Sequence, residues 1–188
     1  MVRFGRGLLL LLVMGACSSS QISSVDAGEP AQSNLYIFVT HECPIANRYA
    51  PEIGRIAKEH LDLVGSTVVV YADANAPASD CATHFDQYYL ASNSPEDDAE
   101  VVSVTMVHDA QHEWVKRFDV RAVPTAVIAR GEAVLYHGRI DDRNPRLGAR
   151  RVQAGQQDLR EALVALRAGS LAPTRTRVVG CSIDRTGG

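Results

Sequence analysis

The stretch Phe38-Val-Thr-His-Glu-Cys43-Pro-Ile-Ala46 places a cysteine between a strand-like pattern and a helix-like pattern. An apolar run covers residues 35–39, and apolar side chains recur at helical spacing from Ile45 to about residue 60. Pro44 suits the first turn of a helix, where its missing N–H costs nothing. A helix N-terminus stabilises a thiolate through the helix dipole and the free backbone N–H groups. We therefore expect Cys43 to be a reactive thiol.

A second informative stretch, Val120-Arg-Ala-Val-Pro124-Thr-Ala-Val-Ile128, lies about eighty residues after Cys43. The order of strand, cysteine, helix and then Val-Pro-Thr before a hairpin resembles the thioredoxin superfamily. The resemblance implies that the Val123–Pro124 bond is cis and that Pro124 lies against the sulfur of Cys43. A cis X-Pro bond is uncommon, so it is a specific expectation. The backbone before Pro124 would then be available to pair with an extended substrate peptide.

The rest of the chain alternates strand and helix patterns. Further strands are predicted at 67–71, 101–107, 125–128 and 134–137, and further helices at 79–91, 111–118 and 158–167. This alternation, with a hairpin and helix at the end, predicts an α/β thioredoxin-like fold with a central mixed β-sheet flanked by helices. Residues 170–188, which include Cys181, are expected to form an irregular tail.

The N-terminal segment has the features of an export signal. Arg3 and Arg6 precede an apolar run at 8–13, and Met14-Gly-Ala-Cys17 resembles a bacterial lipobox. The expected organisation is therefore a lipoprotein signal peptide (1–16), a flexible tether (17–33), a thioredoxin-like domain (34–169) and a C-terminal tail (170–188). Lipidation of Cys17 would attach the protein to a membrane in the bacterial cell envelope, on the periplasmic or extracytoplasmic face. The alternative is a cytosolic start with a chance leucine run.

Charge excludes one class of partner. The whole chain has a formal net charge of −3, and removal of residues 1–16 leaves 17 basic against 22 acidic residues. A nucleic-acid-binding protein needs a clustered positive surface, so we expect no nucleic-acid partner. An exported location would also allow disulfides to persist.

The residues around Cys43 limit the kind of thiol chemistry. Thioredoxin-like oxidoreductases carry a second cysteine three residues after the first, but that position is Ala46. A dithiol site within residues 43–46 is therefore excluded. Peroxiredoxins place a threonine and a proline before their reactive cysteine. Thr40 matches the threonine position, whereas Tyr36 stands at the proline position, so the peroxidase pattern is half met.

Three further motifs resemble a group of bacterial redoxins. They are Cys43-Pro-Ile-Ala-Asn47 with Tyr49-Ala-Pro51, the segment Gly138–Arg143, and Gly180-Cys-Ser-Ile183. The resemblance covers residues 35–183 and implies a redoxin fold. Our hypothesis is that Cys181 returns to Cys43 and forms the disulfide that Ala46 cannot. A permanent disulfide without turnover is the structural alternative, and Cys81 is a rival resolving thiol.

These patterns predict an envelope redoxin that uses Cys43, Cys181, Pro124 and Thr40 in thiol–disulfide exchange or peroxide reduction. Its substrate would be a protein disulfide or a peroxide, without a cofactor. The first alternative is a copper-binding accessory protein with Cys43, His41 and Cys181 as ligands, since cysteine and histidine bind soft metals. The second is a non-catalytic interaction module with a structural disulfide.

Overall fold

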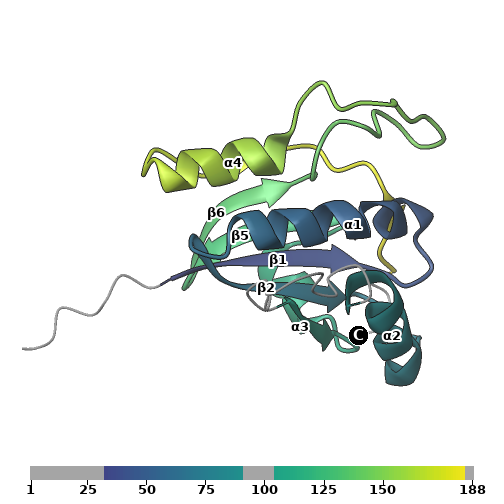
Figure 1. Cartoon of the computed structure of the whole chain (residues 1–188). Coiled ribbons are helices and arrows are strands. Elements are labelled where there is room, and N and C mark those ends of the chain that lie inside the picture. Colours follow the sequence, from purple (N-terminus) through teal and green to yellow (C-terminus); the bar gives the residue numbers. More distant parts are fainter. Residues whose placement is uncertain (1–31, 91–103, 185–188) are drawn as a thin grey trace, which may run out of the picture.

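The computed structural model describes residues 32–90 and 104–184 (Figure 1). The predicted signal peptide, almost all of the tether, Cys17 and the start of the strand expected at residue 101 lie outside these ranges. The elements are β1 (Ser33–Val39), α1 (Pro44–Glu59), β2 (Val64–Tyr71), α2 (Ala78–Phe85), the π-helix η1 (Asp86–Leu90), β3 (Val104–His108), α3 (Glu113–Phe118), β4 (Ala122–Val123), β5 (Thr125–Arg130), β6 (Ala133–Gly138), α4 (Asp158–Arg167), β7 (Thr174–Arg175) and β8 (Cys181–Ser182).

Six strands form one mixed sheet in the order β3-β2-β1-β5-β6-β7. The neighbours β1, β2 and β3 run parallel, and β5 runs antiparallel to both β1 and β6. The central strand β1 joins the two halves, and it is the strand that leads to Cys43. This arrangement confirms the predicted α/β thioredoxin-like fold with a mixed sheet.

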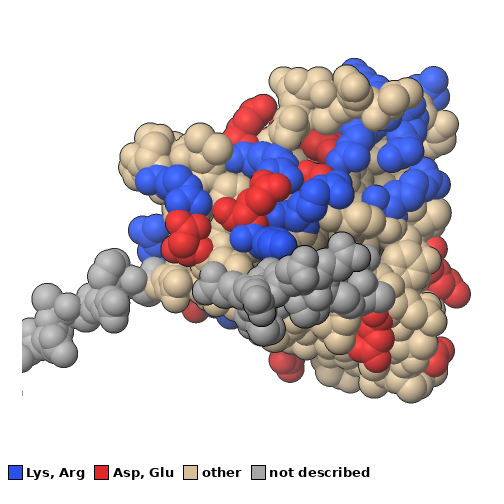
Figure 2. All heavy atoms as spheres, in the orientation of Figure 1, with Lys and Arg blue, Asp and Glu red and all other residues tan. Residues whose placement is uncertain are grey.

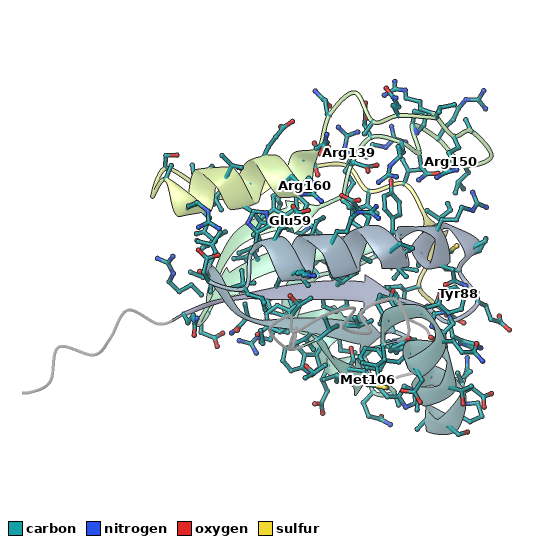
Figure 3. The ribbon with its side chains drawn as sticks, viewed as in Figure 1. Glu59, Tyr88, Met106, Arg139, Arg150 and Arg160 are labelled. Atoms are coloured by element: carbon teal, nitrogen blue, oxygen red, sulfur yellow. The ribbon has the colours of Figure 1, made fainter. Side chains whose placement is uncertain are left out.

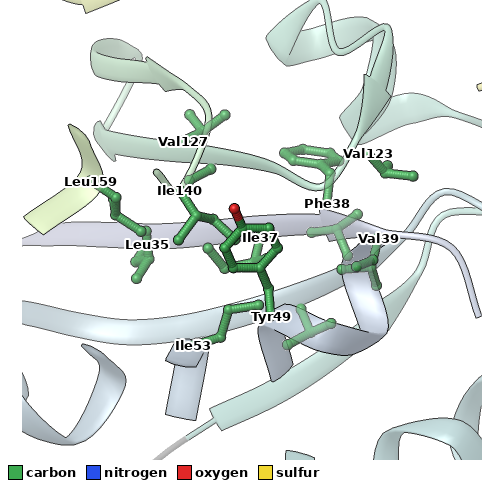
Figure 4. Close-up of a cluster of buried hydrophobic side chains, with 14 of the residues drawn as sticks. Leu35, Ile37, Phe38, Val39, Tyr49, Ile53, Val123, Val127, Ile140 and Leu159 are labelled. Atoms are coloured by element: carbon green, nitrogen blue, oxygen red, sulfur yellow. The ribbon is translucent and has the colours of Figure 1, made fainter. Parts of the chain in front are cut away.

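Alternating side chains of β1 pack against the two layers on opposite faces of the sheet, because successive residues of a strand point to opposite faces. Leu35 and Ile37 belong to the buried cluster that includes Ile53 of α1 and Leu159 of α4 (Figure 4). The ring of Tyr36 lies 5.2 Å from that of Trp114 in α3. Helices α1 and α4 therefore cover one face of the sheet, and α3 covers the other.

Helices α1 and α4 are held side by side by one arginine. Arg160 of α4 pairs with Glu52 of α1 at 2.8 Å and also with Glu59, about two turns further along the same helix face (Figure 3). Figure 2 shows basic and acidic side chains interleaved on this surface. The middle and the C-terminal end of α1 are thereby linked to α4.

Two predictions differ from the observed elements. The second helix, expected over 79–91, is α-helical only to Phe85 and continues as the π-helix η1, with Phe85 stacked on Tyr89 at 5.6 Å. The tail, expected to be irregular, contributes the short strands β7 and β8. The two-residue strand β4 was also not predicted. The remaining described elements agree with the predictions to within a few residues at their ends. Within the described residues no helix is both long and apolar enough to cross a membrane.

Candidate active site

Cys43 lies where β1 has ended and α1 begins. It is the N-cap residue of α1, with extended backbone angles, and its N–H donates to the carbonyl of Thr40 at 3.2 Å. Its own carbonyl accepts the N–H of Asn47, which starts the helical hydrogen bonding. The sulfur therefore lies at the positive end of a 16-residue helix. Cys43 is only 2% exposed, so most of its surface is covered by neighbouring residues.

The loop around Pro124 lies against Cys43 because of the strand register. Strand β5 is antiparallel to β1, and Phe38 is paired with Thr125. The residues just before β5 therefore lie beside those just after β1. The Val123–Pro124 bond is cis, which confirms the prediction. The thiol of Cys43 donates to the carbonyl oxygen of Val123 at 3.7 Å.

Cys181 completes the site from the other end of the chain. Its sulfur lies 2.6 Å from the sulfur of Cys43, and both cysteines carry free thiols in this structure. A disulfide bond is about 2.05 Å long, so oxidation of the pair, with loss of two electrons and two protons, would require only a small shift of either side chain. The structure thus brings together the two cysteines that the hypothesis paired.

The reason for this proximity is β8. Strand β8 pairs antiparallel with β4, with Cys181 opposite Val123 and Ser182 opposite Ala122. The N–H of Ile183 extends this ladder by donating to the carbonyl of Arg121 at 3.1 Å. Sequence patterns missed the strand because it contains only two residues, and its partner is sixty residues away. Strand β8 is extended because it forms backbone hydrogen bonds with residues 121–123, just before Pro124.

The thiol of Cys181 holds its proton tightly. Burial and the contact with the Cys43 sulfur raise the pKa of Cys181 to about 12. The Cys181 thiol therefore keeps its proton at neutral pH while Cys43 is beside it. Cys43, at the helix N-terminus, is the member of the pair with the electrostatic support of a nucleophile.

The other two positions considered for a second thiol do not lie in this arrangement. Ala46 is fully buried in α1, on the side of the helix that faces the core. Cys81 is also fully buried, and burial raises its pKa to about 11. A buried, protonated cysteine behaves as a small apolar side chain. Of the candidate partners, it is Cys181 that directly contacts Cys43.

A hollow of about 610 Å³ lies next to the two sulfurs. Its walls come from the loop before α1, the loop after β2 and the tail, and include Thr40, His41, Cys43, Asp73, Cys181 and Ile183. Several of its lining residues are acidic, namely Glu42, Asp73, Asp80 and Asp184. The hollow gives a substrate access to the site.

A group of possible metal ligands that the sequence patterns did not reveal includes His41 and Asp73 of the hollow's wall and the buried Cys81 behind it. Donor atoms of His41, Asp73 and Cys81 all lie within 4.8 Å of one another. The ring atom Nδ1 of His41 lies 3.3 Å from Asp73 Oδ1, and the backbone N–H of His41 donates to Asp73 Oδ2 at 2.9 Å. The copper set expected from the sequence, Cys43, His41 and Cys181, shares only His41 with this group. Asp73 and Cys81 were missed because only the fold brings them to His41.

Comparisons with known proteins agree with the fold. No family model matches the chain, and no curated protein matches it. A conserved protein from Geobacillus kaustophilus is 23% identical, with a TM-score of 0.64 over 85% of this chain and 79% of its own. A hypothetical protein from Sinorhizobium meliloti is 22% identical, with a TM-score of 0.56 over 85% of this chain and 82% of its own.

A more distant match is a secreted disulfide oxidoreductase from Mycobacterium tuberculosis, at 18% identity and a TM-score of 0.45 over 71% of this chain and 81% of its own. Identities this low concern the fold and not the activity. The thioredoxin-like fold of this chain rests on its own features, namely the mixed sheet, the cysteine at the start of α1 and the cis bond at Pro124.

Proposed function

We propose that the protein is a thiol–disulfide oxidoreductase of the bacterial cell envelope, in which Cys43 is the nucleophile and Cys181 the resolving thiol. The single observation that carries this proposal is the 2.6 Å separation of the two sulfurs beside the cis bond at Pro124. A cysteine at a helix N-terminus supplies the thiolate, and a second thiol in direct contact with it supplies the other half of a redox pair.

The first step is an attack by the Cys43 thiolate on a substrate disulfide. The bond formed joins Cys43 to one substrate sulfur, and the other substrate sulfur leaves as a thiolate that takes a proton from solvent. In the second step the Cys181 sulfur attacks Cys43. The substrate sulfur leaves and takes up the proton that Cys181 gives up, and the Cys43–Cys181 disulfide remains. An external dithiol donor would return the protein to its reduced form, and the reverse sequence would oxidise a substrate dithiol.

Peroxide reduction is the variant of this proposal that the same pair could perform. Attack of Cys43 on a peroxide would give a sulfenic acid and release an alcohol or water, and Cys181 would then form the disulfide and release water. The paired strand at the site favours a peptide disulfide, because an extended backbone already fits beside Val123. The envelope location and the anchor at Cys17 belong to the proposal and rest on the lipobox-like sequence.

The function is tested by following reduction of a model protein disulfide with dithiothreitol as donor. We expect Cys43→Ser to lose all activity above background. In a parallel reaction without dithiothreitol, reduced Cys181→Ser should react once and then accumulate as a mixed disulfide, because the resolving thiol of the site is missing. Cys81→Ser is the matched control and should keep the activity of the parent protein. Full activity in Cys43→Ser would overturn the proposal.

Metal binding is the second candidate function, and the grouping of His41, Asp73 and Cys81 favours it. Histidine, aspartate and cysteine are all zinc ligands, and three protein ligands with an open fourth position are typical of reactive zinc sites. Added Co²⁺ would report this set through a thiolate-to-metal absorption band. We expect Cys81→Ser to abolish the band, and Cys43→Ser and Cys181→Ser to retain it. The opposite pattern would instead support the set containing Cys43 and Cys181.

A further inference from the structure

The C-terminal segment 180–183 occupies the backbone edge next to the nucleophile. Cys181 and Ser182 pair with residues 122–123, and the N–H of Ile183 donates to Arg121. The segment is extended, antiparallel to the residues before Pro124, and presents a cysteine sulfur to Cys43. These are the three properties that a bound substrate peptide would need at this site: an extended backbone, a fixed register and a sulfur within reach.

The register of this strand depends on Gly180. A Cβ atom at this position would lie 1.8 Å from the carbonyl oxygen of Val123 and 2.6 Å from its carbonyl carbon. That oxygen is also the acceptor for the Cys43 thiol. The site therefore has no space for a side chain on the residue before the incoming cysteine, and the obstacle is backbone that cannot rotate away.

The residues after Gly180 alternate between the protein and the solvent, as in any strand with one covered face. Cys181 points to Cys43, Ser182 is exposed, and Ile183 is only 7% exposed. The site thus accepts an apolar side chain two residues after the cysteine and makes no demand on the residue between them.

We infer that segment 180–183 is a built-in substrate mimic, which covers the peptide-binding edge and must detach before a client can bind. This inference rests on the proposed function, since it names the client of the same site. The client is an extended segment in which a glycine precedes the reactive cysteine and an apolar residue stands two positions after it. The tail then returns with Cys181 and displaces the client as it forms the Cys43–Cys181 disulfide.

The probe for this inference is a synthetic peptide with the sequence of residues 178–184, Val-Val-Gly-Cys-Ser-Ile-Asp, whose cysteine carries a thionitrobenzoate group in a mixed disulfide. Attack by Cys43 joins the peptide to the protein and releases coloured thionitrobenzoate, so the rate is read directly. A second peptide has valine in place of the glycine. The full chain with Cys181→Ser is the starting protein, because its tail remains while its competing thiol is gone.

Two further changes separate the tail from the chemistry. Gly180→Val, added to Cys181→Ser, should push the tail off the edge, because its Cβ meets the Val123 carbonyl. Ser182→Val, added to the same protein, is the matched control, since this side chain is exposed. Ile183→Asp is an independent way to detach the tail, because it places a charge where Ile183 is buried. Circular dichroism verifies that each variant is folded.

We expect Gly180→Val and Ile183→Asp to raise the rate with the glycine peptide about tenfold, because the tail no longer competes with the peptide for the edge. A tenfold change corresponds to ~1.4 kcal/mol. Ser182→Val should leave the rate unchanged. The valine peptide should react at least about tenfold more slowly than the glycine peptide in the detached variants. Equal rates for the two peptides, or no increase on detachment, would overturn the inference.

A small aromatic disulfide, tested on the same variants, separates the two levels of the account. If Cys43 reacts with the small disulfide but does not distinguish the peptides, the substrate mimic is wrong and the proposed function stands. If Cys43 reacts with neither reagent in any detached variant, the proposed function itself fails. Cys43→Ser gives the background from other thiols in the chain.

Discussion

Oxidation of the Cys43–Cys181 pair should increase the stability of the fold by a large and calculable amount. The two cysteines are 138 positions apart in the chain, so a bond between them would close nearly the whole domain into one loop. In the chain-entropy model, closing a loop of this length removes enough freedom from the unfolded chain to stabilise the fold by ~5 kcal/mol. Few single bonds in this protein could have an effect of this size.

The assay is urea unfolding of the same protein with and without reductant. At a slope of about 2 kcal/mol per molar urea, ~5 kcal/mol moves the midpoint by roughly 2.5 M. Cys181→Ser should abolish the difference between the two conditions, whereas Cys81→Ser should preserve it. Equal midpoints for the oxidised and reduced parent protein would refute the reasoning. A shift that persists in Cys181→Ser would show that Cys43 pairs with another thiol.

Three other changes test separate parts of the account. The folded-state pKa of Cys181 is raised from 9.0 to about 12, so the reduced protein binds this proton more tightly when folded than when unfolded. The resulting stabilisation is complete below pH 9 and is lost as the pH rises toward 12. In urea titrations, the reduced parent protein should therefore lose stability over this pH window relative to Cys181→Ser. Arg160→Ala should lower the free energy of unfolding by about 1 kcal/mol, because the partly buried link between α1 and α4 is lost, while Arg167→Ala, whose partner Asp62 is at the surface, should change it little. Cys17→Ser should release the protein from bacterial membrane fractions, since stable anchoring requires lipid chains, and unchanged fractionation would contradict the anchor.

Most of the fold could be predicted from local sequence pattern. The helix α4 begins and ends where the apolar spacing of residues 158–167 indicates, and the buried strand β2 follows a continuous β-branched run. The cis bond at Pro124 was predictable because the Val-Pro-Thr segment resembles the cis-proline loop of the thioredoxin superfamily. Such patterns predict elements well because the spacing of apolar residues within one element indicates a helix or a strand without information from the rest of the chain.

The features that escaped prediction depend on contacts between distant residues. Strand β8 has no periodicity, and it becomes extended only because residues 121–123 offer free backbone groups. The need for glycine at position 180 likewise comes from the carbonyl of Val123, more than fifty residues away. His41, Asp73 and Cys81 approach one another only after β1, β2 and α2 are in place. Such groups need the three-dimensional structure because no local pattern encodes them.

The most direct test of the central claim is to identify the bond by which Cys181→Ser holds a substrate. The variant is incubated with a model protein disulfide, alkylated to block free thiols and digested for mass mapping of the trapped complex. We expect a single mixed disulfide at Cys43, with Cys81 recovered as an alkylated thiol after unfolding. The account would be contradicted by a complex linked through Cys81. It would also be contradicted if no complex formed under conditions where the parent protein reduces the same disulfide. Either result would be inconsistent with Cys43 as the nucleophile and Cys181 as the thiol that releases the substrate.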